Sequence, residues 1–191
     1  MQKWIDLLQN ITLTEKASKL VIISQLQLFN FEAETGIILP AEYKNFCQIF
    51  GSGMFGDLVS IHYLSSSLVQ ASTKAIEIVK QQIKKYPSKN KLQDKKLINW
   101  LNSLLIFASD DRGNIAAWDL KSFDELKNTY DIYWIQIDDF NDKMYKITSN
   151  FFDFINNFCL GRKSFDFLPE YMRLEPCDSF TSYKAEPFSS W

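Results

Sequence analysis

Two short apolar runs near the middle of the chain, residues 104–108 and 115–120, constrain the fold most strongly. The six residues between them, 109–114 (SDDRGN), are of the types that form tight turns. Apolar runs of strand length on both sides of a turn predict a β-hairpin. Residues 132–137 form a third run that extends the sheet, and residues 58–64 are rich in β-forming side chains. The sequence therefore predicts a sheet built around a central hairpin.

Helical periodicity surrounds these predicted strands. Pro40 is followed by apolar residues at i, i+3, i+4 and i+7 between Tyr43 and Phe50, a spacing that places them on one face of a helix. Ser149 can cap a later helix with a similar stripe. The predicted helices, in chain order, cover residues 4–11, 19–35, 40–50, 68–83 and 149–160.

Two segments show no regular pattern. Residues 87–96 (PSKNKLQDKK) are polar and begin with a proline, so they predict a mobile connection. Residues 162–191 contain three prolines among aromatic residues and are predicted to be irregular but packed on the core. No linker or repeat divides the chain. We therefore expect one domain over residues 1–191, with a core of about 20–161, a Lys-rich insertion at 68–96 and this irregular C-terminal tail.

Composition indicates a single well-packed unit. The 191 residues are 46% hydrophobic and 15% aromatic, enough for a large core. The formal net charge of -2 disfavours general nucleic-acid binding, which requires a basic surface. Cys47, Cys159 and Cys177 lack C-x-x-C spacing and are expected to be buried thiols. The N-terminus does not resemble a leader and no apolar run is long enough for a membrane span, so we expect a cytoplasmic protein.

Charge is distributed unevenly along the chain. Residues 69–103 carry eight Lys against two acidic residues, whereas residues 108–143 carry nine acidic residues against four basic ones. Two solvated faces are the simpler explanation of this pattern. An acidic surface that attracts a basic partner is the alternative.

Three patterns could carry chemistry, and each has a plainer explanation. Residues 51–56 match G-x-G-x-x-G, but a dinucleotide site needs a strand before it and a helix after it, and the predicted order is reversed. The neighbouring carboxylates at 110–111 and 138–139 fall in a turn and at a strand end, where both members are solvated. His62 is the one histidine and no motif places a nucleophile beside it. We therefore predict no catalytic residue, no cofactor and no metal site.

Three segments follow one another along the chain in an order that a known family shares. They are residues 34–46 (ETGIILPAEYKNF), residues 106–120 with IFASDDRGN and WDL, and residues 147–155 (ITSNFFDFI). They resemble the E-x-x-G-x-x-LP-x-x-Y-x-x-F opening, the central hairpin and the closing helix of the SUKH superfamily. This superfamily joins fungal cell-wall regulators of the Smi/Knr type to bacterial and viral relatives. The first segment has one residue fewer between its glutamate and glycine than the family pattern. The long helix with its Lys-rich connection, and the tail after Gly161, have no counterpart in that pattern.

The resemblance implies an α+β fold with a curved, mainly antiparallel sheet flanked by helices. For a bacterial chain it implies a non-catalytic immunity protein, which binds and neutralises a cognate toxin in the cytoplasm, with a basic nuclease domain as one candidate. The alternative is a regulatory or scaffold protein of the fungal type, which also acts by protein–protein contact. The oligomeric state stays open.

The predicted partner-binding residues form an acidic rim with aromatic anchors. Trp118 and Tyr133 are the candidate anchors, because desolvated aromatic side chains carry most of the affinity at an interface. Two alternatives stay open: Trp118 lies in the core of the sheet, or the interface lies at the Lys-rich residues 89–96. No direct contact with nucleic acid or a membrane is expected. The acidic rim consists of Asp110, Asp111, Asp138, Asp139 and Asp142.

Overall fold

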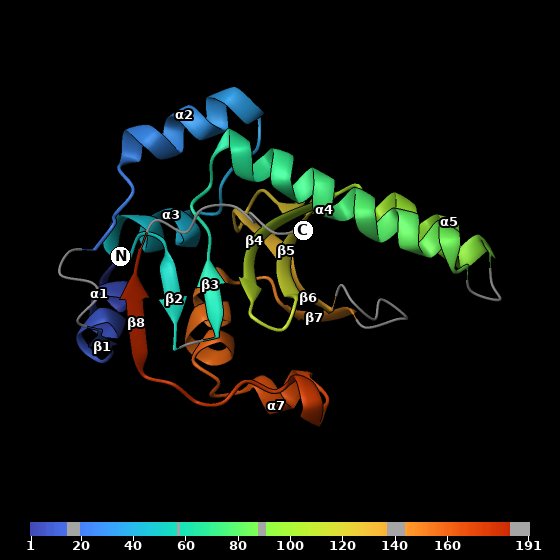
Figure 1. Ribbon diagram of the computed structural model, residues 1–191. Helices are drawn as coiled ribbons and strands as arrows, with labels where there is room; N and C mark the ends of the chain where they lie inside the picture. Colours follow the sequence, from blue (N-terminus) through green and yellow to red (C-terminus); the bar gives the residue numbers. More distant parts are fainter. Residues whose placement is uncertain (15–19, 57, 88–90, 137–143, 184–191) are drawn as a thin grey trace.

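An eight-stranded sheet forms the centre of the protein in the computed structural model, which describes residues 1–14, 20–56, 58–87, 91–136 and 144–183. The strands lie in the order β1-β8-β2-β3-β4-β5-β6-β7 (Figure 1). Neighbours are antiparallel, apart from the parallel pair β1 and β8. The predicted α+β class with a mainly antiparallel sheet is confirmed. The strands are β1 (Thr12–Leu13), β2 (Gly53–Phe55), β3 (Val59–Ile61), β4 (Leu104–Asp110), β5 (Asn114–Asp124), β6 (Thr129–Gln136), β7 (Met144–Thr148) and β8 (Ser179–Ser182).

Helices pack on both faces of this sheet. No helix in the described part of the chain is long and apolar enough to cross a membrane. The helices are α1 (Gln2–Gln9), α2 (Gln25–Thr35), α3 (Ala41–Ile49), α4 (Ser66–Lys85), α5 (Lys91–Leu101), α6 (Phe151–Asp153), the π-helix η1 (Phe154–Cys159), α7 (Ser164–Phe167) and the 3-10 helix η2 (Glu170–Met172).

The central hairpin forms where the sequence predicts it. β4 and β5 pair in antiparallel fashion, and Gly113 turns the chain with a φ of 80°. Asp110 closes the turn, because its Oδ1 accepts hydrogen bonds from the backbone N–H of Arg112 (3.0 Å) and of Asn114 (2.8 Å). An aspartate that binds backbone N–H groups a few residues ahead stabilises such turns. The turn residues that carried the family resemblance therefore have a structural role.

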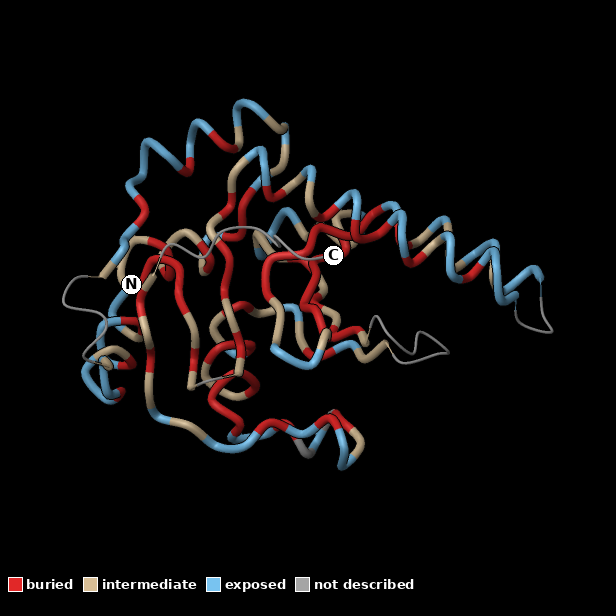
Figure 2. The backbone as a smooth tube through the Cα atoms, in the orientation of Figure 1, coloured by how far each residue is buried: buried red, intermediate tan, exposed pale blue. Residues whose placement is uncertain are grey.

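The larger core cluster lies between one face of the sheet and α1, α3, α6 and η1 (Figure 2). Phe46 of α3 and Phe50, the C-cap of that helix, stack with ring centroids 5.3 Å apart. Trp4 of α1 lies edge-on to Phe46 at 5.5 Å, and Phe107 of β4 lies edge-on to Phe154 at 5.3 Å. The predicted helices at 40–50 and 149–160 are therefore core elements.

The closing helix differs in detail from its prediction. Its cap is Asn150 and not Ser149, because the Asn150 side chain accepts a hydrogen bond of 3.1 Å from the backbone N–H of Asp153. Beyond Asp153 the helix continues as the π-helix η1. The stripe of Phe151, Phe154 and Phe158 is nevertheless buried.

The smaller core cluster lies on the other face, under α4 and α5. Ala75, Ile76 and Val79 of α4 pack there with Ile106 of β4, which confirms the predicted helix over 68–83. The expectation of a mobile connection up to residue 96 is wrong, because α5 begins at Lys91. Its first half is polar, but its last residues close against the sheet, and tertiary packing of one face stabilises a helix more than propensity does.

The tail also contributes a strand. β8 lies between β1 and β2, and Phe180 is buried in the larger cluster, so the expectation of an irregular segment is wrong at 179–182. A Cβ at Gly53 would lie 2.4 Å from the carbonyl oxygen of Thr181, and a glycine is therefore required where β2 meets β8. The G-x-G-x-x-G segment thus follows helix α3 and enters strand β2, which is opposite to the order of a dinucleotide site.

Candidate partner-binding surface

A groove with a volume of 340 Å³ lies between α5 and the strands β6 and β7. We call it the α5–β7 groove. Its apolar side chains pack at the edge of the smaller core cluster and are half-buried, whereas Gln93 and Lys96 are exposed. The groove is lined by Gln93, Lys96, Leu97 and Trp100 from α5, Tyr133 from β6 and Met144 from β7.

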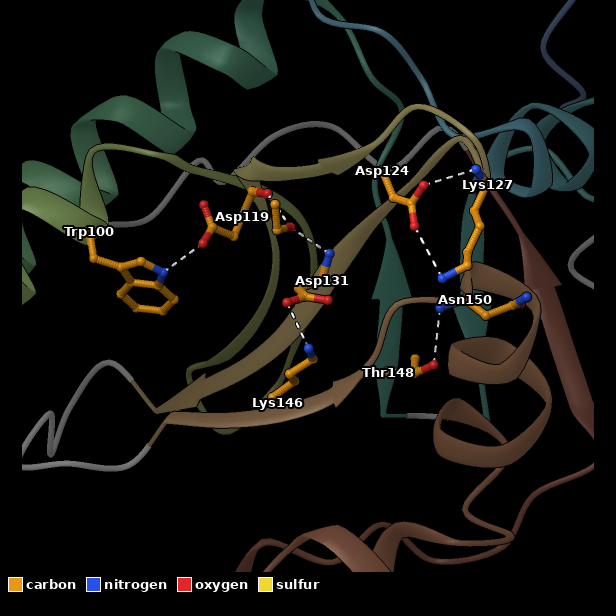
Figure 3. Close-up of polar contacts among 9 residues, drawn as sticks. Trp100, Asp119, Asp124, Lys127, Asp131, Lys146, Thr148 and Asn150 are labelled. Carbon is orange, nitrogen blue, oxygen red and sulfur yellow. Dashed lines mark hydrogen bonds and ion pairs between the residues drawn. The ribbon is translucent and has the colours of Figure 1, made fainter.

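Trp100 is held in place by Asp119 of β5 (Figure 3). The indole Nε1 donates a hydrogen bond of 2.8 Å to Asp119 Oδ2. Asp119 Oδ1 accepts two more, from the hydroxyl of Ser103 at 2.7 Å and from the backbone N–H of Lys121 at 3.0 Å. Asp119 is buried, and these bonds replace the water that its carboxylate loses on folding. The network fixes the end of α5 against β5, and with it one wall of the groove.

Tyr133 forms the opposite side of the groove. Its ring lies edge-on to Trp100, with centroids 4.9 Å apart and an interplanar angle of 75°. Burial, and then the nearby Asp131, raise the pKa of its hydroxyl, which is therefore neutral at pH 7. Lys146 of β7 pairs with Asp131 at 2.7 Å, and this hydrogen bond raises the pKa of Lys146 (Figure 3). The groove therefore combines neutral aromatic walls with a paired charge on the neighbouring strands.

The turn between β4 and β5 supplies the described part of the predicted acidic rim. Asp111 is exposed, whereas Asp110 is half-buried and burial raises its pKa. The turn lies at the end of the sheet where β6 stops, because Asn114 pairs with Gln136, the last residue of β6. The other predicted rim residues, Asp138, Asp139 and Asp142, lie outside the described residues.

Trp118 does not have the predicted role of an exposed anchor. Its side chain is 1% exposed and stacks on Phe107 with ring centroids 4.2 Å apart. Tyr43 of α3 lies edge-on to it at 5.1 Å. Side chains alternate between the faces of a strand, so Trp118 points into the larger cluster while its neighbour Asp119 faces α5. A partner cannot reach Trp118 without unfolding the sheet.

The remaining titratable candidates are buried, apart from Cys177, which is half-buried and so differs from the expected buried thiol. His62 directly follows β3, and its Nε2 lies 3.0 Å from the Ser109 hydroxyl. Burial lowers the pKa of His62 to about 4, so the ring is neutral at pH 7. Burial also raises the pKa values of the thiols of Cys47 and Cys159, which disfavours the reactive thiolate. Among the residues that the structure describes, no group of three or more His, Cys, Asp or Glu side chains could hold a metal ion.

A model of the SMI1 / KNR4 family (SUKH-1) matches residues 22–157, from the segment before α2 into the π-helix η1. The chain belongs to this family. In this SUKH-1 chain the residues that carry the family resemblance are mostly internal: Tyr43, Phe46, Phe151 and Phe154 are all buried. None of the curated proteins matches the chain. The shared motifs therefore specify the SUKH-1 fold. None of the residues that line the α5–β7 groove belongs to these motifs.

The sequence pattern indicates Tyr133 but not its neighbours Leu97, Trp100 and Met144. The start of α5 was not predicted, because it lies within the polar residues 87–96, which were expected to form a connection. One signal was present: Leu97, Trp100 and Leu101 follow i, i+3, i+4 spacing, which indicates the apolar face of a helix. Met144 follows residues 137–143, and nothing in its local pattern connects it with α5.

Proposed function

We propose that this SUKH-1 protein binds a cognate toxin protein in the cytoplasm and neutralises it by covering a surface that the toxin needs, without catalysing a reaction. The α5–β7 groove is the observation that carries the proposal. The contacts of Trp100 with Asp119 and with Tyr133 fix its aromatic walls before a partner arrives. Fixed side chains lose little entropy on binding, and Trp and Tyr are enriched among the residues that dominate binding energy.

The acidic turn between β4 and β5 favours a partner with a basic surface, such as a nuclease domain. Asp111 is exposed at the end of the sheet, and like Asp110 it contributes to the acidic balance of residues 108–143. Complementary charge raises the rate of association more than it raises affinity. In this proposal the turn steers the toxin, and the groove holds it. Asp138, Asp139 and Asp142 belong to the same proposed rim.

A growth assay tests this function directly. Cells that express the proposed cognate toxin domain should survive when they also express the chain. Survival should fail with Leu97→Glu, which places a carboxylate in the groove, and persist with Leu92→Glu, the same change at a residue of α5 that is 64% exposed and does not line the groove. Binding of the toxin without protection would overturn the neutralising role and favour the regulatory alternative. Failure of the wild-type chain to bind the toxin would overturn the proposal as a whole.

A further inference from the structure

Helix α2 is apolar on two opposite faces, and the body of the protein covers one of them. Leu28 and Phe31 are buried in the larger core cluster. Leu26 and Phe29, on the opposite face, are 67% and 64% exposed. The small residue Ala33 continues that face at helical spacing. An apolar face that a folded protein leaves exposed can mark a site of protein–protein contact.

This helix is well formed in the isolated chain. Ser24 and Gln27 make a capping box at its start, and Gly36 ends it in the left-handed conformation with a φ of 70°. Ile23 before the cap and Leu28 in the first turn are both buried, at the positions of a hydrophobic staple. The exposed face is therefore presented by a fixed helix.

The exposed face also carries no charge. The chain from Leu20 to Phe31 contains no acidic or basic residue. The acidic residues near the end of the helix are drawn toward the body: Glu32 pairs with Lys44 at 2.7 Å, and Glu34 accepts a hydrogen bond of 2.8 Å from Ser66. A basic or acidic partner would find nothing to pair with here. A second copy of the same face would meet no like-charge repulsion.

We propose that two copies of this chain associate through α2, with the two helices antiparallel about a two-fold axis. The axis passes between residues 27 and 28, the midpoint between Leu26 and Phe29. Leu26 then packs on Phe29 of the second copy, and Phe29 packs on its Leu26. At each end the small Ala33 leaves room for Ile22 of the other copy, which is also exposed. A two-fold contact needs a patch that is complementary to itself, and this order of side chains supplies one.

The size of the face sets the strength of the dimer. A stable interface buries about 800 Å² per partner. The exposed stripe of this helix of 11 residues, with Ile22, provides well below that area. The dimer is therefore weak and forms only at high protein concentration. Figure 1 shows α2 at the upper left and α5 at the far right, and no residue of α2 lines the α5–β7 groove.

Sedimentation of the full chain at rising concentration is the first test. The wild-type chain should shift from monomer to dimer between micromolar and millimolar concentration. Leu26→Glu or Phe29→Lys should abolish the shift, and Leu92→Glu on α5 should leave it unchanged. All three changes fall on exposed side chains, so unchanged melting temperatures at low concentration verify that the variants fold. A wild-type chain that stays monomeric at millimolar concentration would overturn the proposal.

An equimolar mixture of Leu26→Glu and Phe29→Lys tests the antiparallel arrangement. In the mixed dimer one Glu faces one Lys, and the other site keeps its Leu–Phe contact, so dimers should reappear. In a parallel pair each altered residue would face its own position in the second copy, and the mixture would stay monomeric, which contradicts the proposed axis. If these variants instead lost toxin binding while the wild-type chain stayed monomeric, α2 would be a toxin contact, and the proposed dimer would be wrong while the proposed function stood.

Discussion

Trp100 of α5 and Asp119 of β5 are joined by a hydrogen bond of 2.8 Å from the indole Nε1 to Oδ2. The bond ties a helix with a polar first half to a buried strand of the sheet. It also orients the ring that forms one wall of the α5–β7 groove. The same carboxylate therefore stabilises the fold and orients one wall of the proposed binding groove.

Asp119→Ala should lower the free energy of unfolding by about 1–3 kcal/mol, because it leaves the Trp100 indole N–H without its acceptor and removes the hydrogen bond to the backbone N–H of Lys121. Urea unfolding measures the loss. Asp131→Ala is the matched control, since it removes an aspartate whose ion pair with Lys146 lies near the surface and should cost about 0–1 kcal/mol. Equal losses for both variants would show that the buried hydrogen bonds of Asp119 stabilise the fold no more than a surface ion pair does.

Phe46→Ala and Phe154→Ala should each cost about 3–5 kcal/mol, because each removes a fully buried ring and leaves a cavity. That loss is a large share of the stability of a typical domain. Thermal or urea unfolding gives the comparison with the wild-type chain. Unchanged stability in both variants would contradict the placement of α3 and η1 in the core.

His62 should make the protein less stable in acid. Its pKa is lowered from 6.5 to about 4 by burial, so between these values the unfolded chain binds a proton that the folded chain does not. Above pH 6.5 the ring is neutral in both the folded and the unfolded chain, and its titration does not affect stability. As the pH falls from 6.5 toward 4, the free energy of unfolding should fall by about 3 kcal/mol. Unfolding of the wild-type chain and His62→Gln across this range isolates the effect. Parallel pH profiles would rule out His62 as the source.

Asp111→Asn should slow association with a basic toxin and flatten the dependence of the on-rate on salt, while the off-rate stays nearly constant. Stopped-flow mixing at low and high salt measures both rates. Glu125→Gln, an exposed acid in the turn between β5 and β6, is the control and should change little. Asp110 is unsuitable for this comparison, because its carboxylate holds the turn. An on-rate that Asp111→Asn leaves unaltered at low salt would place the interface elsewhere.

The sequence predicted those parts of the fold in which local pattern and tertiary packing agree. The hairpin followed from two apolar runs around residues 109–114, and α3 followed from the stripe that ends at Phe50. β8 was missed, because Ser179–Ser182 is four residues long and gains its place by pairing with β2, a strand far away in sequence. α5 was missed because its stability comes from contacts of Leu97 and Trp100 with the sheet.

The candidate site was less predictable than the fold. Trp118 and Tyr133 both lie in predicted strands and both are aromatic, yet they point to opposite faces of the sheet. Which face is fully covered depends on helices that pack from elsewhere in the chain. One face is sealed by α3 and α6, and the other is left half open beside α5. The local sequence of a strand therefore does not show which of its faces the helices will cover.

The affinity of the chain for the proposed cognate toxin domain tests the central claim most directly. Titration calorimetry should show tight binding by the wild-type chain and by Leu92→Glu, and a loss of at least about tenfold, or 1.4 kcal/mol, for Leu97→Glu. That result would place the toxin on the α5–β7 groove. Equal affinities for all three proteins would contradict the groove as the binding surface, and an absence of heat with the wild-type chain would contradict the proposed function itself.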